Sequence, residues 1–324
     1  MSVLVSVVVP TCGRGELLER CLGALDAQDM PGHMYEVVVV DDSADGSVGP
    51  LVERVARTAS MAVRCVRSGS RAGPARARNV GWRAARGPII AFTDDDCVPS
   101  PIWLRAGLRA MVASGGADGA YGPIRVPLPS EPTDYERDAA GLERAEFATA
   151  NCFYSRHALR EVGGFDERFA AAWREDSDLF LQLLARGRRL GFACDALVVH
   201  PVRPAGWGVS ISQQRKSMYN ALLYKKHRAL YRERVQPSPP WCYYAIVASL
   251  AAALVAAAFA RGWLMVAMLV AWAALTASFC ARRLRGTSRA PGHVAEMIVT
   301  SVLIPPLAVY WRLRGAVRFR VLFF

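Results

Sequence analysis

Residues 241–280 form a run of forty residues with one charged side chain, that of Arg261. A single helix of this length would extend about 60 Å, whereas the hydrocarbon core of a bilayer is about 30 Å thick. We therefore expect two membrane spans, at about 241–260 and 263–280, with a turn at Arg261-Gly262. Each span is apolar around its whole circumference, which argues against a buried helical hairpin of a soluble protein.

Charge is distributed unevenly along the chain. Residues 1–202 contain 23 Lys and Arg against 26 Asp and Glu, a net charge of −3. Residues 203–324 contain 17 Lys and Arg against only Glu233 and Glu296, a net charge of +15. Basic residues interleaved with apolar runs favour an anionic membrane surface, where each contributes about 1 kcal/mol of attraction. We expect this surface as a partner and no nucleic acid.

The loop after the second span predicts the orientation of the anchor. Within 281–293 it carries four basic residues, Arg282, Arg283, Arg285 and Arg289. By the positive-inside rule this loop is cytoplasmic. We see no signal peptide before the first apolar run, and the eight cysteines form no C-x-x-C pair, which is typical of a reducing compartment. The sequence predicts an inner (cytoplasmic) membrane protein with its globular part on the cytoplasmic side.

Two more segments near the predicted spans have two interpretations each. The apolar stretch 294–311 contains Glu296 and Pro305-Pro306 and has basic residues on both sides, so a third span and an interfacial or re-entrant segment both stay open. Residues 211–234 predict a basic amphipathic helix on the membrane surface, with a solvated charged helix as the alternative. A breaker, QPSPP, follows at 236–240.

We therefore expect three domains: a catalytic domain at 1–202, a surface helix with its linker at 203–240, and a membrane domain at 241–324. The first of these alternates between strand and helix patterns. Strands are expected at 3–9, 36–40, 61–66 and 88–93, with helices at 16–27 and 75–85. Repeated β-α-β units predict an α/β fold with a mostly parallel sheet. Further along we expect a surface loop at 126–140, a helix at 175–184 and a strand at 191–200.

Polar motifs directly follow three of the expected strands. They are PTCGR at 10–14, Asp41-Asp42, and Asp94-Asp95-Asp96. Since ligands of open α/β sheets bind outside the carboxyl ends of the strands, these motifs should converge. The carboxylates of the Asp94–Asp96 triplet suit Mg²⁺ or Mn²⁺, which can then bridge a diphosphate. Asp41-Asp42 either bind a base or ribose, or serve the turn-rich segment DDSADGS in which they lie.

Two later motifs add groups that can do chemistry. Glu175-Asp176 opens a helix, where a carboxylate can act as general base for an acceptor hydroxyl. Acids at a helix N-terminus are also favoured by the macrodipole alone, so this interpretation has a structural alternative. His200, before Pro201, is either a further metal ligand or a structural histidine.

Together the motifs of residues 3–202 resemble glycosyltransferase family 2, which has the inverting GT-A fold. The resemblance lies in the order and spacing of several segments. These are VSVVVPTCGR at 5–14, VVVVDDSADGS at 37–47, GPARARNVGW at 73–82, FTDDDCVP at 92–99, VGGFDERF at 162–169, REDSDL at 174–179 and His200-Pro201.

The resemblance implies a Rossmann-like GT-A catalytic domain joined to C-terminal transmembrane helices. It implies that Asp176 is the catalytic base and that Asp94 and Asp96 form the D-x-D pair, with His200 completing the site of Mg²⁺ or Mn²⁺. The nucleotide-sugar donor is expected to contact several motif residues, including Asp94 of the D-x-D pair. They are Thr11, Arg14, Asp41, Asp42, Arg78, Asp94, Asp95 and Glu175.

The sequence also departs from the family pattern. Gly13 stands where Asn is common, which leaves the base contacts less defined. The Q-x-x-R-W motif of processive synthases is absent, the nearest text being QQRK at 213–216. We therefore expect transfer of one sugar, from a UDP-sugar as the family default, to a membrane lipid or lipid-linked acceptor. The alternatives are a processive polysaccharide synthase and a non-catalytic membrane scaffold.

Overall fold

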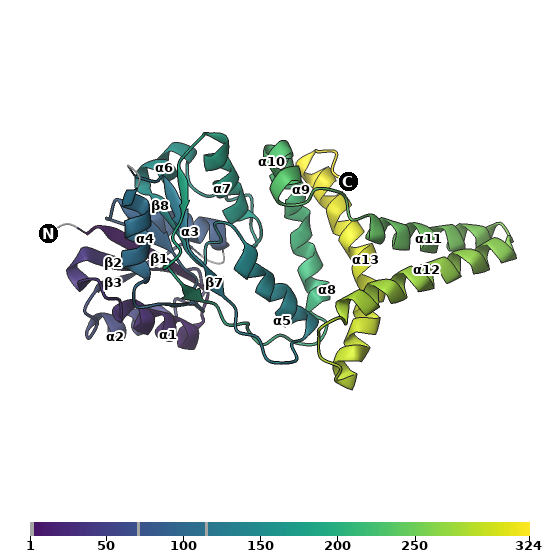
Figure 1. The fold of residues 1–324 in the computed structure, drawn as a ribbon, viewed down its shortest axis with the longest axis horizontal. Coiled ribbons are helices and arrows are strands. Elements are labelled where there is room, and N and C mark those ends of the chain that lie inside the picture. The colour runs from purple at the N-terminus through teal and green to yellow at the C-terminus, as the bar shows by residue number, and fades with distance from the viewer. Residues whose placement is uncertain (1–2, 70–71, 114–115) are drawn as a thin grey trace. The chain divides into compact units, whose positions relative to one another are not determined.

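The computed structural model describes residues 3–69, 72–113 and 116–324 (Figure 1). By internal contacts the chain divides into two compact units. Unit 1 comprises Met1–Pro127 and Ala140–Val202, and unit 2 comprises Leu128–Ala139 and Arg203–Phe324. The three domain limits expected from the sequence stay predictions. The units differ from them by grouping residues 128–139, which we call the strap, with the C-terminal part.

Unit 1 is built on a seven-stranded sheet with the order β3-β2-β1-β4-β8-β6-β9. In the described part of this sheet, β8 alone runs against its neighbours, so the mostly parallel sheet expected from the sequence is confirmed. The strands are β1 (Val5–Thr11), β2 (Tyr35–Asp41), β3 (Ala62–Arg67), β4 (Ile89–Phe92), β6 (Gly119–Tyr121), β8 (Cys152–Ser155) and β9 (Leu190–Phe192).

The register of the central strands brings their carboxyl ends to one edge. β1 and β2 are buried along their whole length, as their continuous valine runs predict. They pair in parallel from Val5 with Tyr35 to Thr11 with Asp41. On its other side β1 pairs in parallel with β4, where Val8 lies beside Phe92. The polar residues after β1, β2 and β4 therefore leave the sheet at the same edge.

Helices cover both faces of this sheet. On one face, α1 (Gly15–Asp26), α2 (Gly49–Ala56) and α4 (Trp103–Val112) share a core with the side chains of β1 and β2. On the other face lies α3 (Pro74–Ala84), and a Cβ at Gly81 would come 2.3 Å from Cγ1 of Val8. The close approach of α3 thus requires glycine at this position. The other helical segments in the described part of unit 1 are η1 (Gly32–Met34), η3 (Ala140–Arg144), α6 (Arg156–Val162) and α7 (Glu175–Ala185).

A small second sheet links two distant parts of unit 1. It has the order β5-β10-β7, formed by Val98–Pro99, Val198–Val199 and Ile124–Arg125. β10 pairs antiparallel with β5, which directly follows the Asp94–Asp96 triplet. This pairing places His200 next to the triplet.

Unit 2 consists of helices. α11 (Trp241–Ala258) and α12 (Gly262–Arg283) form a hairpin, and α13 (Pro291–Phe319) crosses this hairpin steeply (Figure 1). All three helices are long and apolar enough to cross a membrane. The shorter segments are α5 (Asp134–Ala139) in the strap, α8 (Val209–Gln213), η4 (Gln214–Met218), α9 (Tyr219–Lys226) and α10 (Arg228–Arg234).

Three local expectations from the sequence were wrong. The strand expected at 191–200 is two short strands, β9 and β10, with a turn between them closed by the Ala196 N–H donating to the Ala193 carbonyl. The loop expected at 126–140 contains helix α5. The single helix expected at 211–234 is divided, and its clearest break is at His227, whose φ of −135° and ψ of 54° are not helical.

Candidate functional site

The Asp94–Asp96 triplet lies where the carboxyl ends of β1, β2 and β4 meet. The Thr93 N–H donates to the Val8 carbonyl, at 3.4 Å, which keeps the chain beside β1 as β4 ends. On the neighbouring strand pair, Thr11 lies opposite Asp41. Although separated by tens of residues in sequence, the three polar motifs converge here, as the sequence predicts for an open α/β sheet.

Arg78 is the central cation of this site. It projects from α3 and its side chain is 4% exposed. Its Nη2 donates to Oδ1 of Asp94 at 2.8 Å, and its Nη1 donates to Oε1 of Glu175 at 2.9 Å. Burial works against the charge of Asp94, but Arg78 and then His200 hold the pKa of this carboxyl below its ordinary value. Arg78 thus joins the triplet to the start of α7.

Asp95, the middle residue of the triplet, points into the protein. Its side chain is fully buried, and Nε of Arg14 lies 2.9 Å from its Oδ2. Burial raises the pKa of Asp95 to about 6, against the opposing effects of Arg14 and the Thr11 hydroxyl. The ion pair fixes the segment PTCGR against the triplet. Asp95 and Arg14 therefore contact each other in this structure.

Asp96 forms the part of the site that best suits a cation. Its Oδ1 lies 3.4 Å from Nε2 of His200. With Sγ of Cys97, these groups offer three ligand atoms that lie within 4.8 Å of one another. Burial and the charges of Asp94 and Asp96 raise the pKa of the Cys97 thiol well above its ordinary value, so this thiol is a poor ligand. The carboxylate and the imidazole fit a divalent cation such as Mn²⁺ or Mg²⁺.

Asp94 is not part of this cluster, and its Oδ1 accepts a hydrogen bond from Arg78. Its role as a metal ligand stays a prediction. The sequence placed Asp94, Asp96 and His200 together in one metal site. Among the described residues, the structure brings Asp96 and His200 into contact and turns one oxygen of Asp94 toward Arg78.

The side chains of Asp41 and Asp42 both accept hydrogen bonds from backbone N–H groups. Oδ1 of Asp41 accepts the Ser43 N–H at 2.8 Å, which is the turn chemistry that the sequence left open. Oδ1 of Asp42 accepts the Ser68 hydroxyl and the Ala72 N–H, and its Oδ2 accepts the Gly73 N–H at 3.0 Å. Asp42 thus anchors the segment that leads into α3 and Arg78. Contacts of either aspartate with a nucleoside stay predictions.

Glu175 and Asp176 open α7 with different surroundings. Glu175 is buried on Arg78, and burial together with the negative charge of Asp176 raises its pKa to about 7. Asp176 is half-buried, and its Oδ1 accepts the Ser177 N–H at 2.6 Å. One carboxyl is therefore fixed inside the protein, and the other is held at the accessible helix end. A general base needs this second arrangement.

Asn79 is a site-building residue that the sequence reasoning missed. Its Nδ2 donates to the Phe165 carbonyl and to Oε1 of Glu167, and its Oδ1 accepts the Phe165 N–H at 2.9 Å. It thereby docks the GGFD turn against α3, next to Arg78. The motif GPARARNVGW is recognisable in the sequence. The contact of the Asn79 amide with Phe165, 86 residues further along the chain, gives no local signal.

Comparisons with known proteins agree with this geometry. The profile described as Glycosyl transferase family 2 matches residues 6–176, more than half of the chain. Glycosyltransferase AglE of Haloferax volcanii is 30% identical over 62% of this chain and 68% of its own length. The pre-mycofactocin glycosyltransferase of Mycobacterium tuberculosis is 30% identical over 61% of this chain, but the match spans only 43% of that enzyme.

Solved structures share the fold. The mannosyltransferase PcManGT of Pyrobaculum calidifontis, in complex with GDP-Man and Mn²⁺, matches with a TM-score of 0.57 at 22% identity, over 97% of this chain and 87% of that one. Residues 1–349 of Staphylococcus aureus TarS, in complex with UDP-GlcNAc, match with a TM-score of 0.51 at 17% identity, over 96% and 92%. The sheet, the acidic edge and the profile match agree, and the chain belongs to glycosyltransferase family 2.

Proposed function

We propose that this protein is an inverting, metal-assisted glycosyltransferase that moves one sugar from a nucleotide-sugar donor to a lipid-linked acceptor. The observation that carries the proposal is the buried bridge from Asp94 through Arg78 to Glu175, with N–O distances of 2.8 and 2.9 Å. The bridge joins the acidic edge, where a diphosphate would bind, to the residue next to Asp176. Donor and base are thereby held on one scaffold.

The donor is proposed to lie along the edge formed by Thr11, Asp41 and the triplet. UDP-sugars are the first choice, and the TarS structure that shares this fold is a complex with UDP-GlcNAc. Asp96 and His200 would hold the divalent ion. When bound, such an ion acts as a Lewis acid that stabilises negative charge on a leaving diphosphate.

Asp176 is proposed to act as the general base. Its Oδ1 is held by the Ser177 N–H, so its other oxygen is left to accept the proton of the acceptor hydroxyl. As that proton moves to Asp176, the hydroxyl oxygen forms a bond to the anomeric carbon of the donor. The bond from this carbon to the diphosphate oxygen breaks on the opposite face, and the nucleoside diphosphate leaves with the electron pair. One displacement of this kind inverts the anomeric configuration.

A first prediction concerns Asp176→Asn. The amide cannot take a proton, so transfer should fall by roughly 10²- to 10⁴-fold, the usual contribution of a general base. Donor binding should persist because Arg78, Asp94 and Asp96 are unchanged. Nucleoside diphosphate release measures the first effect, and calorimetric titration of UDP with Mn²⁺ measures the second. Asp195→Asn, at an exposed loop position, is the matched control. Near-normal turnover of Asp176→Asn would exclude this residue as the base.

The acceptor is proposed to be a membrane lipid or a lipid-linked sugar, because the chain carries three helices able to cross a membrane. The hairpin and the basic residues after it would hold the enzyme at the cytoplasmic face, where polyprenyl-linked substrates are accessible. We expect purified enzyme in liposomes to transfer sugar to a polyprenyl-phosphate-linked acceptor and much more slowly to the same acceptor head group without its lipid. Equal rates with the two acceptors would contradict a lipid-linked substrate.

A further inference from the structure

The third long helix, α13, has one apolar face that nothing in unit 2 covers. Its exposed large apolar residues recur at helical spacing along the whole helix. They are Ile298, Val299, Val302, Leu303, Tyr310, Leu313 and Val317, which we call the apolar row. We propose that α13 lies in the plane of the membrane interface with the apolar row in lipid, and that α11 and α12 alone cross the bilayer.

The inner face of α13 packs on the protein and, beside apolar residues such as Met297 and Ile304, carries several buried polar groups. Thr300, Ser301 and Arg312 are at most 5% exposed. Oε1 of Glu296 accepts the Gly208 N–H at 2.8 Å, and a Cβ at Gly315 would come 2.4 Å from the Met218 carbonyl oxygen. This face therefore packs closely on the segments that precede the hairpin. A helix whose protein-facing side carries buried polar and charged groups and whose other side is apolar throughout has the pattern of an interfacial helix.

The hairpin helices are different. Only 22% of the apolar window of α11 and 11% of that of α12 are buried within the protein, against 39% for α13. Large side chains such as Phe259, Trp263 and Val270 are exposed on them. With 22 residues, α12 extends about 33 Å, close to the hydrocarbon thickness of a bilayer. The hairpin fits a full crossing with lipid around most of its surface.

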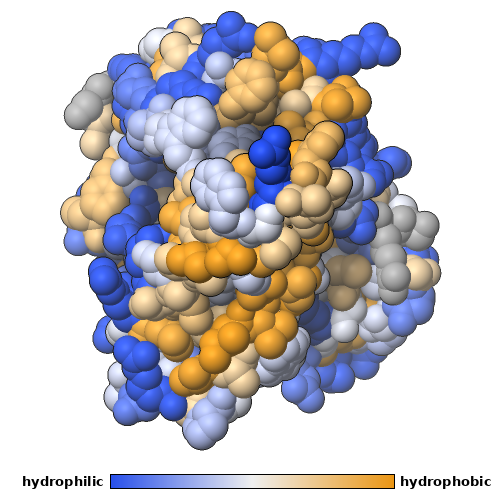
Figure 2. All heavy atoms as spheres, turned by 90° about the vertical axis from the view of Figure 1, so that its right-hand side faces the viewer, coloured by the Kyte–Doolittle hydropathy of each residue, from blue (hydrophilic) through white to orange (hydrophobic). Residues whose placement is uncertain are grey.

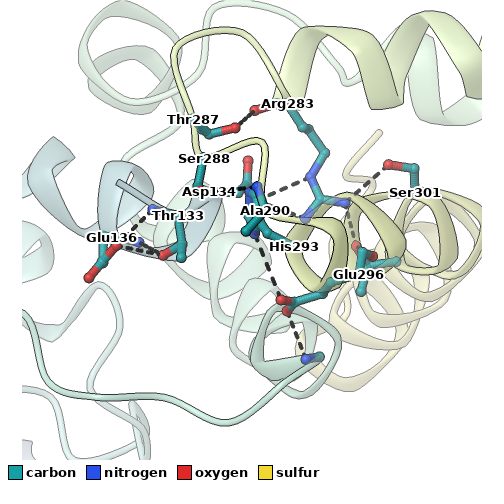
Figure 3. Close-up of polar contacts among 12 residues, drawn as sticks. Thr133, Asp134, Glu136, Arg283, Thr287, Ser288, Ala290, His293, Glu296 and Ser301 are labelled. Atoms are coloured by element: carbon teal, nitrogen blue, oxygen red, sulfur yellow. Dashed lines mark hydrogen bonds and ion pairs between the residues drawn. The ribbon is translucent and has the colours of Figure 1, made fainter. Parts of the chain in front are cut away.

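Arg283 sets the depth of α13. It is the last residue of α12, so in a hairpin that crosses the bilayer it lies at the membrane boundary. Its Nη1 donates to Oγ1 of Thr300 at 2.7 Å and to Oγ of Ser301 at 3.1 Å (Figure 3). These residues lie near the middle of α13. In a spanning helix the middle would be at the bilayer centre, where a charged Arg is costly.

An acidic partner supports the same depth. Nη2 of Arg283 lies 2.7 Å from Oδ2 of Asp134 in the strap, and the Arg283 side chain is 9% exposed (Figure 3). The Ser288 N–H also donates to the Pro132 carbonyl, at 2.8 Å. Asp134 is charged and the strap backbone is polar. In the sequence, the strap lies between the two segments that form unit 1. The contacts of Asp134 and the strap backbone with Arg283 and with the loop before α13 fit the boundary of the membrane and do not fit its interior.

The arrangement of the three helices agrees with an in-plane α13. Ile304 of α13 packs with Ile246 and Phe279, which lie toward the basic end of the hairpin and away from its tip at Arg261. From this contact α13 runs across the hairpin (Figure 1). Figure 2 shows apolar side chains gathered in a band with hydrophilic ones around it. A helix that crosses the hairpin at its base lies along the membrane surface.

The occupant of the apolar row is inferred to be the lipid of an anionic membrane. Basic residues stand on both sides of the row, namely Arg282, Arg285, Arg289, Arg314, Arg318 and Arg320. Each Arg or Lys near an anionic surface contributes about 1 kcal/mol of attraction. These charges complement lipid head groups, whereas two copies meeting through this face would bring like charges together. The inference rests on the hairpin insertion proposed above and is independent of the transfer chemistry.

The test measures depth along the helix. A small fluorescent amino acid is placed singly at Ile298, Val302, Leu313 or Val317 of the full chain, in liposomes of anionic and zwitterionic phospholipids. Lipids brominated at shallow or deep acyl positions then quench the label. We expect all four sites to be quenched most by the shallow bromines, with little difference among them. Val270, exposed on α12, is the control and should be quenched most by the deep bromines.

Each other pattern overturns the inference. Deep quenching at Val302 that becomes shallower at Ile298 and Leu313 and shallowest at Val317 would mean a spanning α13, because these sites lie progressively farther from the middle of the helix. Deep quenching at Val270 with no quenching on α13 would mean that protein, such as a second copy, covers the row. No quenching at any site, including Val270, would refute the inserted hairpin as well. Nucleoside diphosphate release by the same samples shows separately whether the proposed transfer function holds.

Discussion

The backbone at Gly13 has a φ of +74°, in the left-handed region where glycine is unstrained and asparagine is the next best tolerated residue. This explains a departure from the family pattern at the residue scale. Members commonly have Asn at this place after Pro-Thr-x, and both residues satisfy the same backbone requirement. Asp41 and Asp42 likewise act on backbone, through turns and the segment before α3. Much of the recognisable motif therefore encodes the shape of the site.

The role of Arg78 depends on both the planar shape and the positive charge of its guanidinium group. It donates to two carboxylates that lie on different elements, and its ring contact with Phe165 has a distance of 5.9 Å from Cζ to the centroid. A planar guanidinium with several fixed donors can bridge two acids in this way. An ammonium group is a point charge and cannot reproduce the geometry.

We predict that Arg78→Lys lowers transfer on the order of 100-fold, because displaced catalytic groups lose their alignment even when the charge is kept. Arg78→Gln should in addition destabilise unit 1 by about 3 kcal/mol, since it leaves buried Glu175 without its cation. Transfer rates and denaturant unfolding of the purified protein measure the two effects. Arg76→Lys, two residues away on the exposed face of α3, is the control and should change neither. Full activity in Arg78→Lys would show that the bridge has no catalytic role.

At the scale of elements, strands β1 to β4 were predictable, whereas the shorter strands after them and several helices were not. The valine runs of β1 and β2 are buried on both faces, and a continuous apolar run predicts such a strand. Helix α5 was missed within a Pro-rich segment, although TDYE at 133–136 is a capping box. In the structure the Thr133 N–H donates to Oε2 of Glu136 at 2.7 Å, and the Glu136 N–H donates to Oγ1 of Thr133.

Other features had no local signal at all. The helix break at His227 occurs without proline or glycine, in a region where Tyr231 packs against Phe323. The bridge from Arg78 to Glu175 joins residues that are 97 positions apart. Propensity and periodicity describe residues that are neighbours along the chain. Tertiary contacts between distant residues can change the local structure without leaving a signal in either. Motif resemblance identified the candidate residues of the site, and the structure shows which of them contact one another.

The contact of the strap with α12 predicts an element-scale effect. Asp134→Asn removes the carboxylate charge beside the mostly buried guanidinium of Arg283, which keeps its hydrogen bonds to Thr300 and Ser301. We expect unit 2 to lose about 2 kcal/mol of stability, the usual range for hydrogen bonds to charged groups. Thermal unfolding in detergent measures this loss. Glu131→Gln, an exposed charge in the same strap, should have no effect. If Asp134→Asn melts like the unchanged protein, the contact does not hold the strap.

At the scale of the whole molecule, charge and hydropathy together predict an orientation. The net charge of −3 for residues 1–202 and +15 for residues 203–324 separates a nearly neutral catalytic part from a basic membrane part. Arg282, Arg283, Arg285 and Arg289 follow the second hairpin helix closely. By the positive-inside rule, these residues predict that this end of the hairpin, and with it both chain ends of the hairpin, lies in the cytoplasm.

We predict that trypsin added to inside-out membrane vesicles degrades the catalytic part, whereas in right-side-out vesicles it reaches at most the hairpin turn at Arg261. Immunoblotting of the fragments measures the cleavage. Arg261→Gln should remove any cleavage in right-side-out vesicles and leave the pattern in inside-out vesicles unchanged. Degradation of the catalytic part in intact right-side-out vesicles would reverse the proposed orientation.

The strap has a consequence for how such enzymes can evolve. Its ends continue into unit 1 at Pro127 and Ala140, while its own contacts, including Asp134 with Arg283, belong to unit 2. Recombination that exchanged the C-terminal part at residue 202 would leave the strap facing a foreign helix. The C-terminal part of this protein is therefore not a portable module, and the strap and the end of α12 should be inherited as a matched pair.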